Sequence, residues 1–126
     1  MEKQVVIGLG SNINAGVNIP RALNELNVLG NVLKESEVLV TKPIGIKEQN
    51  DFSNSVVLMK VPLSESDLTI RLKQIEDKLG RDRSRPKFGP REIDLDIIVY
   101  DDVIVDDDYH SRDFLQKLVA QVWEKK

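Results

Sequence analysis

Two aspartates on one predicted strand are the residues best placed to do chemistry. Residues 92–100 are rich in Ile, Leu, Val and Tyr, and successive side chains of a strand point to opposite faces. Asp94 and Asp96 therefore share one face. The opposite face is apolar and is expected to lie in the core; it consists of Ile93, Leu95, Ile97 and Val99. Neighbouring carboxylates repel, and a divalent cation between them, magnesium in particular, would relieve that repulsion. A solvated strand face with two acids is the alternative and, for such a pair alone, the commoner case.

A cationic loop stands directly before this strand. It holds five basic side chains within eleven residues, in a chain of formal net charge -3; they are Arg81, Arg83, Arg85, Lys87 and Arg91. Surface salt bridges would account for some of these charges, whereas convergence on an anion would account for their density. A guanidinium group can bond two phosphate oxygens at once. Phosphoryl transfer needs cations for the phosphates beside carboxylates for magnesium, so loop and strand together favour a nucleotide-phosphate site.

The composition limits the class of protein and the kinds of partner that the sequence can have. The 126 residues are 40% hydrophobic and 31% charged, which predicts one globular domain spanning 1–126. The chain has no cysteine, which excludes disulfides and thiolate metal sites. No apolar run approaches a signal sequence or a membrane span, so we expect a cytoplasmic protein without a membrane partner. The loop cations are too local to follow a duplex, so nucleic acid is not an expected partner, and we expect a monomer.

The first half of the chain supplies a strand, a helix and two further strands. The strand at 5–9 runs into glycine-rich residues 8–12, which lack the third glycine of a dinucleotide fingerprint and are expected to form a tight turn. Ile19-Pro20 favours a helix entry, and the helical stripe ends at Gly30. Strands are expected at 32–40 and 52–61.

The second helix has the clearest start. Ser64 as N-cap and Asp67 three residues on form a pair like a capping box. After the aspartate strand comes a turn at Asp101-Asp102, and Ser111 is expected to cap a final helix. The order is βαββαβ plus a C-terminal helix, an α+β arrangement that predicts a four-stranded antiparallel sheet with two helices on one face.

Four further side chains are candidates for the same site. Phe52 and Asn54 share a face at the loop end of their strand, where they offer an aromatic plane and an amide. Core packing and a turn role are the alternatives. Glu76 lies near the end of the second helix, where it could face the cleft or remain a surface acid. His110, the only histidine, is next to Arg112 and is otherwise a surface residue.

Together these residues resemble the 6-hydroxymethyl-7,8-dihydropterin pyrophosphokinase family of folate biosynthesis, from about residue 6 to residue 100. The matching segments are Gly8-Leu9-Gly10-Ser11-Asn12, Pro43-x-Gly45 with Gln49, Phe52-x-Asn54, Ile75-Glu76-x-x-Leu79-Gly80-Arg81-x-Arg83, and Gly89-Pro90-Arg91-x-Ile93-Asp94-Leu95-Asp96. The last segment is highly specific. The resemblance implies a ferredoxin-like fold and transfer of the terminal pyrophosphate of ATP to the pterin hydroxymethyl oxygen, with release of AMP.

The resemblance also implies a role for each matching residue. Asp94 and Asp96 would bind two magnesium ions that bridge the triphosphate of ATP, the co-substrate, and would be catalytic together with three arginines. The residues implied for ATP are Glu76, Arg81, Arg83, Phe88, Arg91, Ile97, His110 and Arg112; Arg81, Arg83 and Arg91 are the catalytic arginines among them. The residues implied for the pterin are Thr41, Pro43, Ile44, Gly45, Phe52, Asn54 and Phe114.

Three departures from the family pattern stand out. The Leu-x-x-Pro-His stretch before Arg112 is absent, and only Tyr109-His110 remains. Phe88 stands where many members carry tryptophan. The sequence ends at Lys126, short of the usual C-terminal region, and a more open nucleotide pocket would follow. A pterin- or nucleotide-binding homologue with weak or no turnover is therefore an alternative, and a ferredoxin-like sensor or interaction domain is a more remote one.

Overall fold

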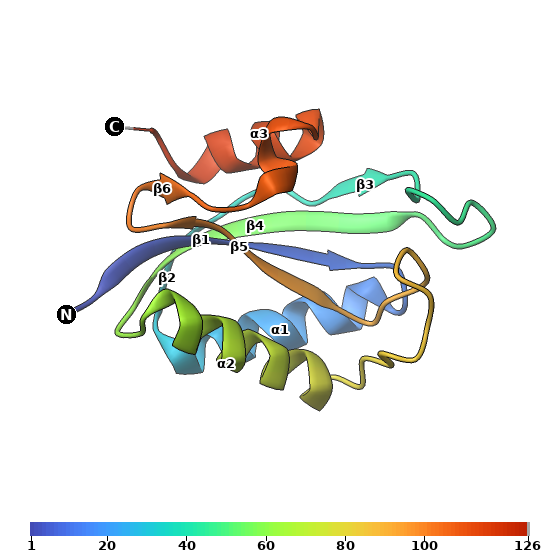
Figure 1. The fold of residues 1–126 in the computed structure, drawn as a ribbon, viewed down its shortest axis with the longest axis horizontal. Coiled ribbons are helices and arrows are strands. Elements are labelled where there is room, and N and C mark those ends of the chain that lie inside the picture. Colours follow the sequence, from blue (N-terminus) through green and yellow to red (C-terminus); the bar gives the residue numbers. More distant parts are fainter. Residues whose placement is uncertain (126) are drawn as a thin grey trace.

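A computed structural model describes residues 1–125, whose six strands form one antiparallel sheet (Figure 1). The strand order is β2-β4-β1-β5-β6, and β3 also pairs with β4. The strands are β1 (Lys3–Ser11), β2 (Asn31–Glu35), β3 (Leu39–Thr41), β4 (Phe52–Val61), β5 (Asp94–Tyr100) and β6 (Val103–Ile104). The central strand β1 pairs with β4 on one side and with β5, the aspartate strand, on the other.

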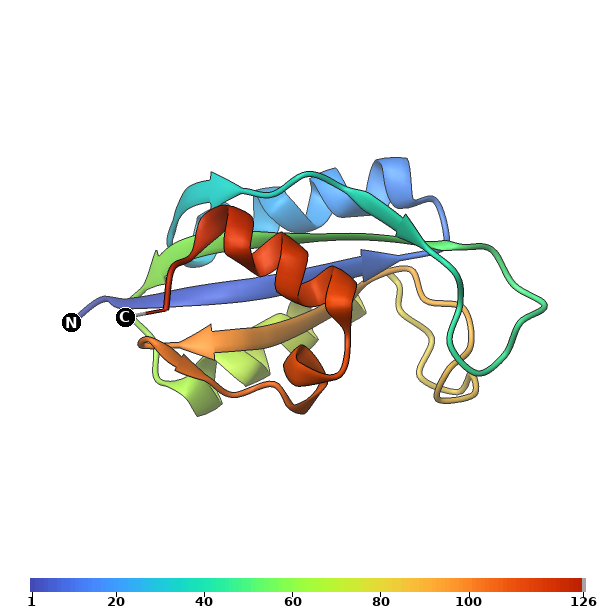
Figure 2. The same ribbon diagram turned by 90° about the horizontal axis from the view of Figure 1, so that it is seen from above.

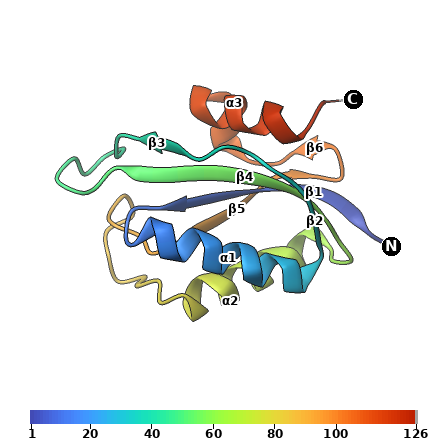
Figure 3. The same ribbon diagram turned by 180° about the vertical axis from the view of Figure 1, so that it is seen from behind.

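Helices cover both faces of this sheet. α1 (Ala15–Leu29) and α2 (Glu65–Lys78) lie side by side on one face, and α3 (Asp113–Val122), which follows the short 3-10 helix η1 (Asp107–His110), lies on the other (Figures 1 and 3). α3 lies over the part of the sheet nearer the chain termini, while the loops before β4 and before β5 extend together from the opposite end (Figure 2). In the part of the chain that the structure describes, no helix has the length and apolarity needed to cross a membrane.

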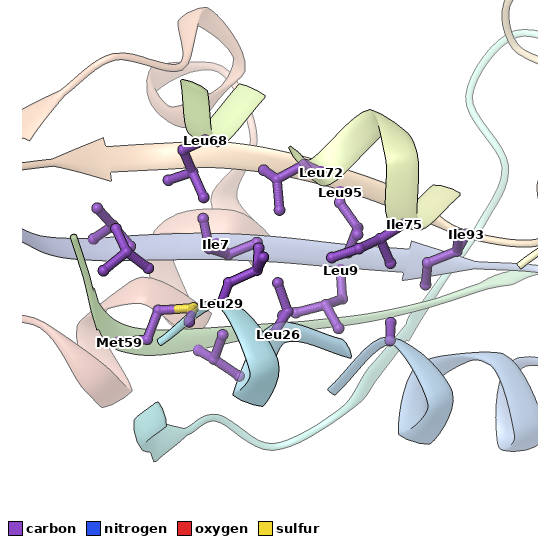
Figure 4. Packing of buried hydrophobic residues seen from close by; sticks show 14 of the residues in the cluster. Ile7, Leu9, Leu26, Leu29, Met59, Leu68, Leu72, Ile75, Ile93 and Leu95 are labelled. Carbon is purple, nitrogen blue, oxygen red and sulfur yellow. The ribbon is translucent and has the colours of Figure 1, made fainter. Parts of the chain in front are cut away.

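The larger core lies between the sheet and the pair α1 and α2 (Figure 4). Alternate residues of β1, among them Ile7 and Leu9, point into it, as the strand period requires. Leu26 of α1 and Leu68 and Leu72 of α2 meet them from the helices. These residues are nearly inaccessible to solvent, so this core fixes β1 and β5 against α1 and α2.

A second core lies under α3. Val6 and Val56, from the opposite face of β1 and β4, pack against the apolar side of α3. That side consists of Leu115, Leu118, Val119 and Val122, and Trp123 continues it just beyond the helix, as the helical spacing predicts. This packing places the start of α3, with Phe114, beside the uncovered end of the sheet.

The βαββαβ order with a C-terminal helix is confirmed, but the sheet has six strands where four were predicted. The single strand predicted at 32–40 is split into β2 and β3. At the break, the Ser36 amide still donates to the Val56 carbonyl, but the Val56 amide donates to the Ser36 hydroxyl, and the main chain then leaves the strand line. Glu37 continues away from the sheet and binds Gln121 of α3.

Three local predictions were wrong. α1 begins at Ala15, with Pro20 inside the helix, because Asn14 adopts a left-handed conformation that starts the helix earlier than Ile19-Pro20 suggested. Gly8 and Gly10 lie within β1 and form no turn. Ser111 ends η1, and Arg112 is the N-cap residue of α3, without a side-chain cap.

One residue of the predicted apolar face of β5 points the other way. The pairing of β1 with β5 shifts between Val6 and Ile7, so that Ile97 pairs with Ile7 while Val99 pairs with Val6. Val99 therefore joins the core under α3, whereas Ile93, Leu95 and Ile97 face α1 and α2 as predicted. A bulge of this kind cannot be read from an unbroken apolar run.

Candidate active site

A row of three residues crosses the uncovered end of the sheet. Gly10 on β1 pairs with Asp94 on β5 and with Asn54 on β4, so these residues share one face. Gly8 likewise pairs with Asp96. Because Gly10 carries no side chain, the space between Asp94 and Asn54 stays open, whereas the side chain of Ile98 packs over Gly8.

A cavity of about 260 Å³ occupies this space. Five of the residues implied for the pterin line it together; they are Thr41, Ile44, Phe52, Asn54 and Phe114. Phe88, Arg91, Arg112 and both aspartates line it as well. The cavity therefore brings three aromatic rings and an amide together with charged groups. Pro43 and Gly45 lie in the same loop but do not line it.

The amide of Asn54 has a fixed orientation. Its nitrogen donates to the hydroxyl of Thr41 at 2.8 Å. Its oxygen lies over Gly10, where a Cβ atom would come within 3.3 Å of it. The amide oxygen is thus presented to the cavity as an acceptor.

A second cavity, of about 340 Å³, lies on the α2 side of β5. It is lined by four of the residues implied for ATP, namely Glu76, Arg81, Arg83 and Ile97, and by Thr69, Leu72, Lys73 and Val105. Asp94 and Asp96 line this cavity too. The two cavities therefore meet at the aspartate pair.

Asp94 is held by two arginines. One carboxylate oxygen, Oδ1, accepts from Arg81 at 3.0 Å, and the other, Oδ2, lies 2.9 Å from Nη1 of Arg91. Arg81 begins the cationic loop and Arg91 ends it, so both ends of this loop are tied to β5.

Glu76 anchors the two arginines of the second cavity. Only 3% of it is exposed, and its carboxylate lies 2.9 Å from Arg81 Nη1 and accepts from Arg83 at 2.9 Å and from the Leu95 amide at 2.7 Å. A buried carboxylate needs such partners, because an unpaired buried charge is costly. Glu76 thus faces the second cavity, but its own oxygens are committed to the protein.

Asp96 differs from its neighbour. Burial of its carboxyl group, repulsion by Asp94 and a hydrogen bond with Asp94 raise the pKa of Asp96 to about 8. Asp96 is an exposed residue, and the raised pKa comes first from the protein atoms around its carboxyl group, which disfavour the charged form, and then from Asp94.

The aspartate pair fits a divalent cation. The two carboxylates face one space, and the part of the raised pKa of Asp96 that comes from repulsion by Asp94 is one that a cation would relieve. Residues 1–125 hold no group of three or more metal-ligating side chains, so the protein itself would supply few ligands. Phosphate oxygens and water would complete the shell, as is usual for magnesium.

Asn12 and Gln49 are functional candidates to which sequence reasoning assigned no role. Asn12 is 5% exposed, and its amide nitrogen donates to Gln49 Oε1 at 2.8 Å, while its oxygen accepts from the Arg91 amide. Gln49 in turn donates to the carbonyl oxygen of Phe88 at 2.6 Å. Gly45, with a φ of 87°, packs so closely on Phe88 that a Cβ there would lie 2.9 Å from it. The loop before β4 and the loop before β5 are therefore joined. Asn12 and Gln49 both belong to segments that match the family pattern, and this match was the sequence signal for their importance.

Arg85, Arg112 and His110 do not lie in the second cavity with the residues implied for ATP that line it. Arg85 turns away from both cavities and pairs with Glu92 at 2.7 Å, so it does not converge on the site with the other arginines. Arg112 lines the first cavity and lies 3.4 Å from Asp108, an acid of η1 that lines the same cavity. His110 packs edge-on against Tyr109 and lines neither cavity.

The chain is similar to known proteins along most of its length. Residues 6–124 match the family model described as 7,8-dihydro-6-hydroxymethylpterin-pyrophosphokinase. Relatives named 2-amino-4-hydroxy-6-hydroxymethyldihydropteridine pyrophosphokinase include one from Aquifex aeolicus, 36% identical over 102 residues, and one from Haemophilus influenzae, 34% identical over 120 residues. The matches cover 80% and 86% of this chain and 63% and 74% of those relatives. A Bacillus subtilis relative of the same name is 36% identical over 103 residues, which cover 79% of this chain and 61% of that protein.

The family match spans nearly the whole sequence and includes all five segments on which the resemblance was based. This chain belongs to the 7,8-dihydro-6-hydroxymethylpterin-pyrophosphokinase family.

Proposed function

We propose that this protein transfers the terminal pyrophosphate of ATP to the hydroxymethyl oxygen of 6-hydroxymethyl-7,8-dihydropterin and releases AMP. The observation that carries the proposal is the meeting of two cavities at Asp94 and Asp96, one with aromatic and amide groups and one with arginines. Membership of the family supports the same conclusion.

The pterin occupies the first cavity in this proposal. Phe52 and Phe114 provide faces for a flat heterocycle, and aromatic pairs of this kind favour stacked arrangements. Asn54, oriented by Thr41, accepts hydrogen bonds from ring N–H groups through its free oxygen. The hydroxymethyl group then points towards the aspartates.

ATP occupies the second cavity, with its phosphates directed to the same point. Leu72, Ile97 and Val105 give this cavity an apolar wall for the base. Arg81 and Arg83, held by Glu76, offer fixed donors to the phosphate oxygens, and Arg91 approaches from the other end of the loop. A preorganised set of cations stabilises developing charge without reorganisation during the reaction.

Asp94 and Asp96 would hold magnesium, which would neutralise phosphate charge and align the triphosphate. The pterin oxygen attacks the β-phosphorus, its proton leaves, and the bond between the β-phosphorus and the oxygen on the α-phosphate breaks. AMP keeps that oxygen. The residues contribute mainly by orientation, and closure of Phe88 over the cavity excludes water.

Formation of AMP from ATP and Mg²⁺, measured with and without 6-hydroxymethyl-7,8-dihydropterin, tests this function. We expect AMP only when the pterin is present, and none from Asp96→Asn, a variant of similar size that removes one carboxylate charge. Pterin and nucleotide binding without AMP formation would contradict the proposed activity.

A further inference from the structure

The two carboxylates of the site are not in equivalent states. Both oxygens of Asp94 are occupied by guanidinium groups, at 3.0 Å from Arg81 and 2.9 Å from Arg91. Asp96 has no ion-pair partner among residues 1–125. One of the two carboxylates proposed to hold the metal is therefore already neutralised by the protein itself.

The two arginines differ in how firmly they are held. Arg81 also lies 2.9 Å from the buried carboxylate of Glu76, and its side chain is 17% exposed, so it is fixed between two acids. The other partner of Arg91 is the backbone carbonyl of Lys87, which belongs to the same loop. Asn12 holds the backbone of Arg91, but the guanidinium group of Arg91 can leave Asp94 without breaking a pair to a buried carboxylate, whereas Arg81 cannot leave without breaking its pair with Glu76.

We propose that Arg91 is an internal counter-ion that keeps Asp94 Oδ2 closed to free divalent cations until a polyphosphate draws the guanidinium group away. The inference rests on the proposed function, since it takes the triphosphate of ATP as the competing anion. A guanidinium group binds phosphate through two parallel hydrogen bonds, so a triphosphate offers Arg91 at least as good a partner as one carboxylate oxygen.

This exchange sets the order in which ligands enter. Without nucleotide, a cation at Asp94 would have to displace Arg91 or lie beside its positive charge, and both are unfavourable. With nucleotide, the arginine moves to the phosphates and Oδ2 is released at the same moment. Cation and nucleotide then bind as a unit, and Asp94 remains paired in both states.

Titration of Mn²⁺ into the nucleotide-free protein, with the free ion counted by its paramagnetic resonance signal, tests the inference. Arg91→Met removes the counter-ion and leaves Arg81 in place. We expect this variant to bind Mn²⁺ at least about fivefold more tightly than the unmodified protein, because a positive charge about 4 Å away in a water-like dielectric weakens binding about fivefold for each unit of charge on the ion. Arg91→Gln serves the same purpose if Arg91→Met does not fold.

Two controls make the result specific. Lys87→Met removes the same charge from the same loop, but Lys87 forms no ion pair with Asp94, so we expect less than about a twofold gain. Adding Asp94→Asn to Arg91→Met should abolish the gain, because it removes the carboxylate that was freed.

Equal Mn²⁺ affinity in the unmodified protein and both Arg91 variants would overturn the inference. So would an equal gain from Lys87→Met, or a gain that survives Asp94→Asn. These outcomes are separate from the proposed activity: absence of AMP would refute the activity and leave the Mn²⁺ result standing, and unchanged Mn²⁺ affinity would leave the activity standing.

Discussion

The side chain of Gln49 donates a hydrogen bond of 2.6 Å to the carbonyl oxygen of Phe88, and this bond joins the two loops that close over the first cavity. The same amide nitrogen donates to the Ile46 carbonyl at 2.7 Å, and its oxygen accepts from Asn12. Gln49 thus holds its own loop in shape and attaches it to the loop that carries Arg91.

Gln49→Glu tests this junction with little change of size. The substitution keeps an acceptor for Asn12 but places a carboxylate oxygen against the carbonyls of Ile46 and Phe88. Losing donors to such groups costs about 1–3 kcal/mol, so we expect kcat/KM for the pterin to fall about fivefold to a hundredfold. Steady-state kinetics would measure it.

Glu48→Gln, at the exposed neighbouring position, is the matched control and should leave kcat/KM within about twofold. Equal kinetics in Gln49→Glu and the unmodified protein would show that the loops close without this bond. A fall in thermal stability with normal kinetics would indicate a role in folding alone.

A substitution at Gly10 tests whether the pterin lies over β1, at the base of the first cavity. Gly10→Val places a branched side chain between Asp94 and Asn54, where even a Cβ lies 3.3 Å from the Asn54 oxygen. Overpacking of this kind costs about 1–3 kcal/mol, so we expect pterin affinity by calorimetry to fall by about tenfold or more. Valine is favourable in a strand, so the sheet should remain intact.

Gly16→Ala is a suitable comparison, because a Cβ at Gly16 meets nothing within 4 Å. It should leave pterin affinity unchanged. Normal pterin binding by a folded Gly10→Val protein would show that the ligand does not lie over β1.

Asp96 should make the metal-free protein less stable at alkaline pH. Its pKa is raised to about 8 in the folded state, above the ordinary value of 3.8, so the folded state holds the proton more tightly than the unfolded state does. Stability associated with this group therefore declines as pH rises from about 4 to about 8 and stays low above that.

Asp96→Asn removes the penalty. With a chelator present, we expect this variant to melt at a higher temperature than the unmodified protein, by a margin that is larger at pH 9 than at pH 5. Glu48→Gln provides the control for loss of one charge. A margin that is the same at both pH values, or largest at pH 5, would contradict the raised pKa.

Glu76 should be important for folding as well as for the site. Glu76→Gln leaves Arg81 and Arg83 without their shared buried carboxylate, and breaking such a pair from one side costs about 3–5 kcal/mol. Because Arg83 is partly exposed, we expect the free energy of unfolding by urea to fall by about 2–4 kcal/mol. Asp77→Asn, which removes only the exposed partner of Arg83, should cost less than about 1 kcal/mol.

Local sequence patterns correctly predicted β4 and the start of α2. The strand predicted at 52–61 is β4, and Ser64 caps α2 by accepting from the Asp67 amide at 3.1 Å. These features depend on alternation and on a cap, which involve neighbouring residues only. The break at Ser36 and the bulge that turns Val99 depend on pairing with distant strands, so no local pattern reports them.

The candidate site was predictable in its charged residues and less so in their partners. Asp94, Arg81 and Arg91 stood out by type and spacing, and the structure brings them together. That Arg85 turns to Glu92 follows only from the path of the loop. Asn12 and Gln49 lie 37 positions apart, and their junction requires the loops to be folded against each other.

The fate of each phosphate of ATP tests the central claim most directly. With ATP labelled separately at the α-, β- and γ-phosphorus, and with Mg²⁺ and 6-hydroxymethyl-7,8-dihydropterin, the products would be separated and the label in each counted. Pyrophosphate transfer predicts α label in AMP and equal β and γ label in the pterin product. Accumulation of ADP, or of label in inorganic phosphate with none in the pterin, would contradict it.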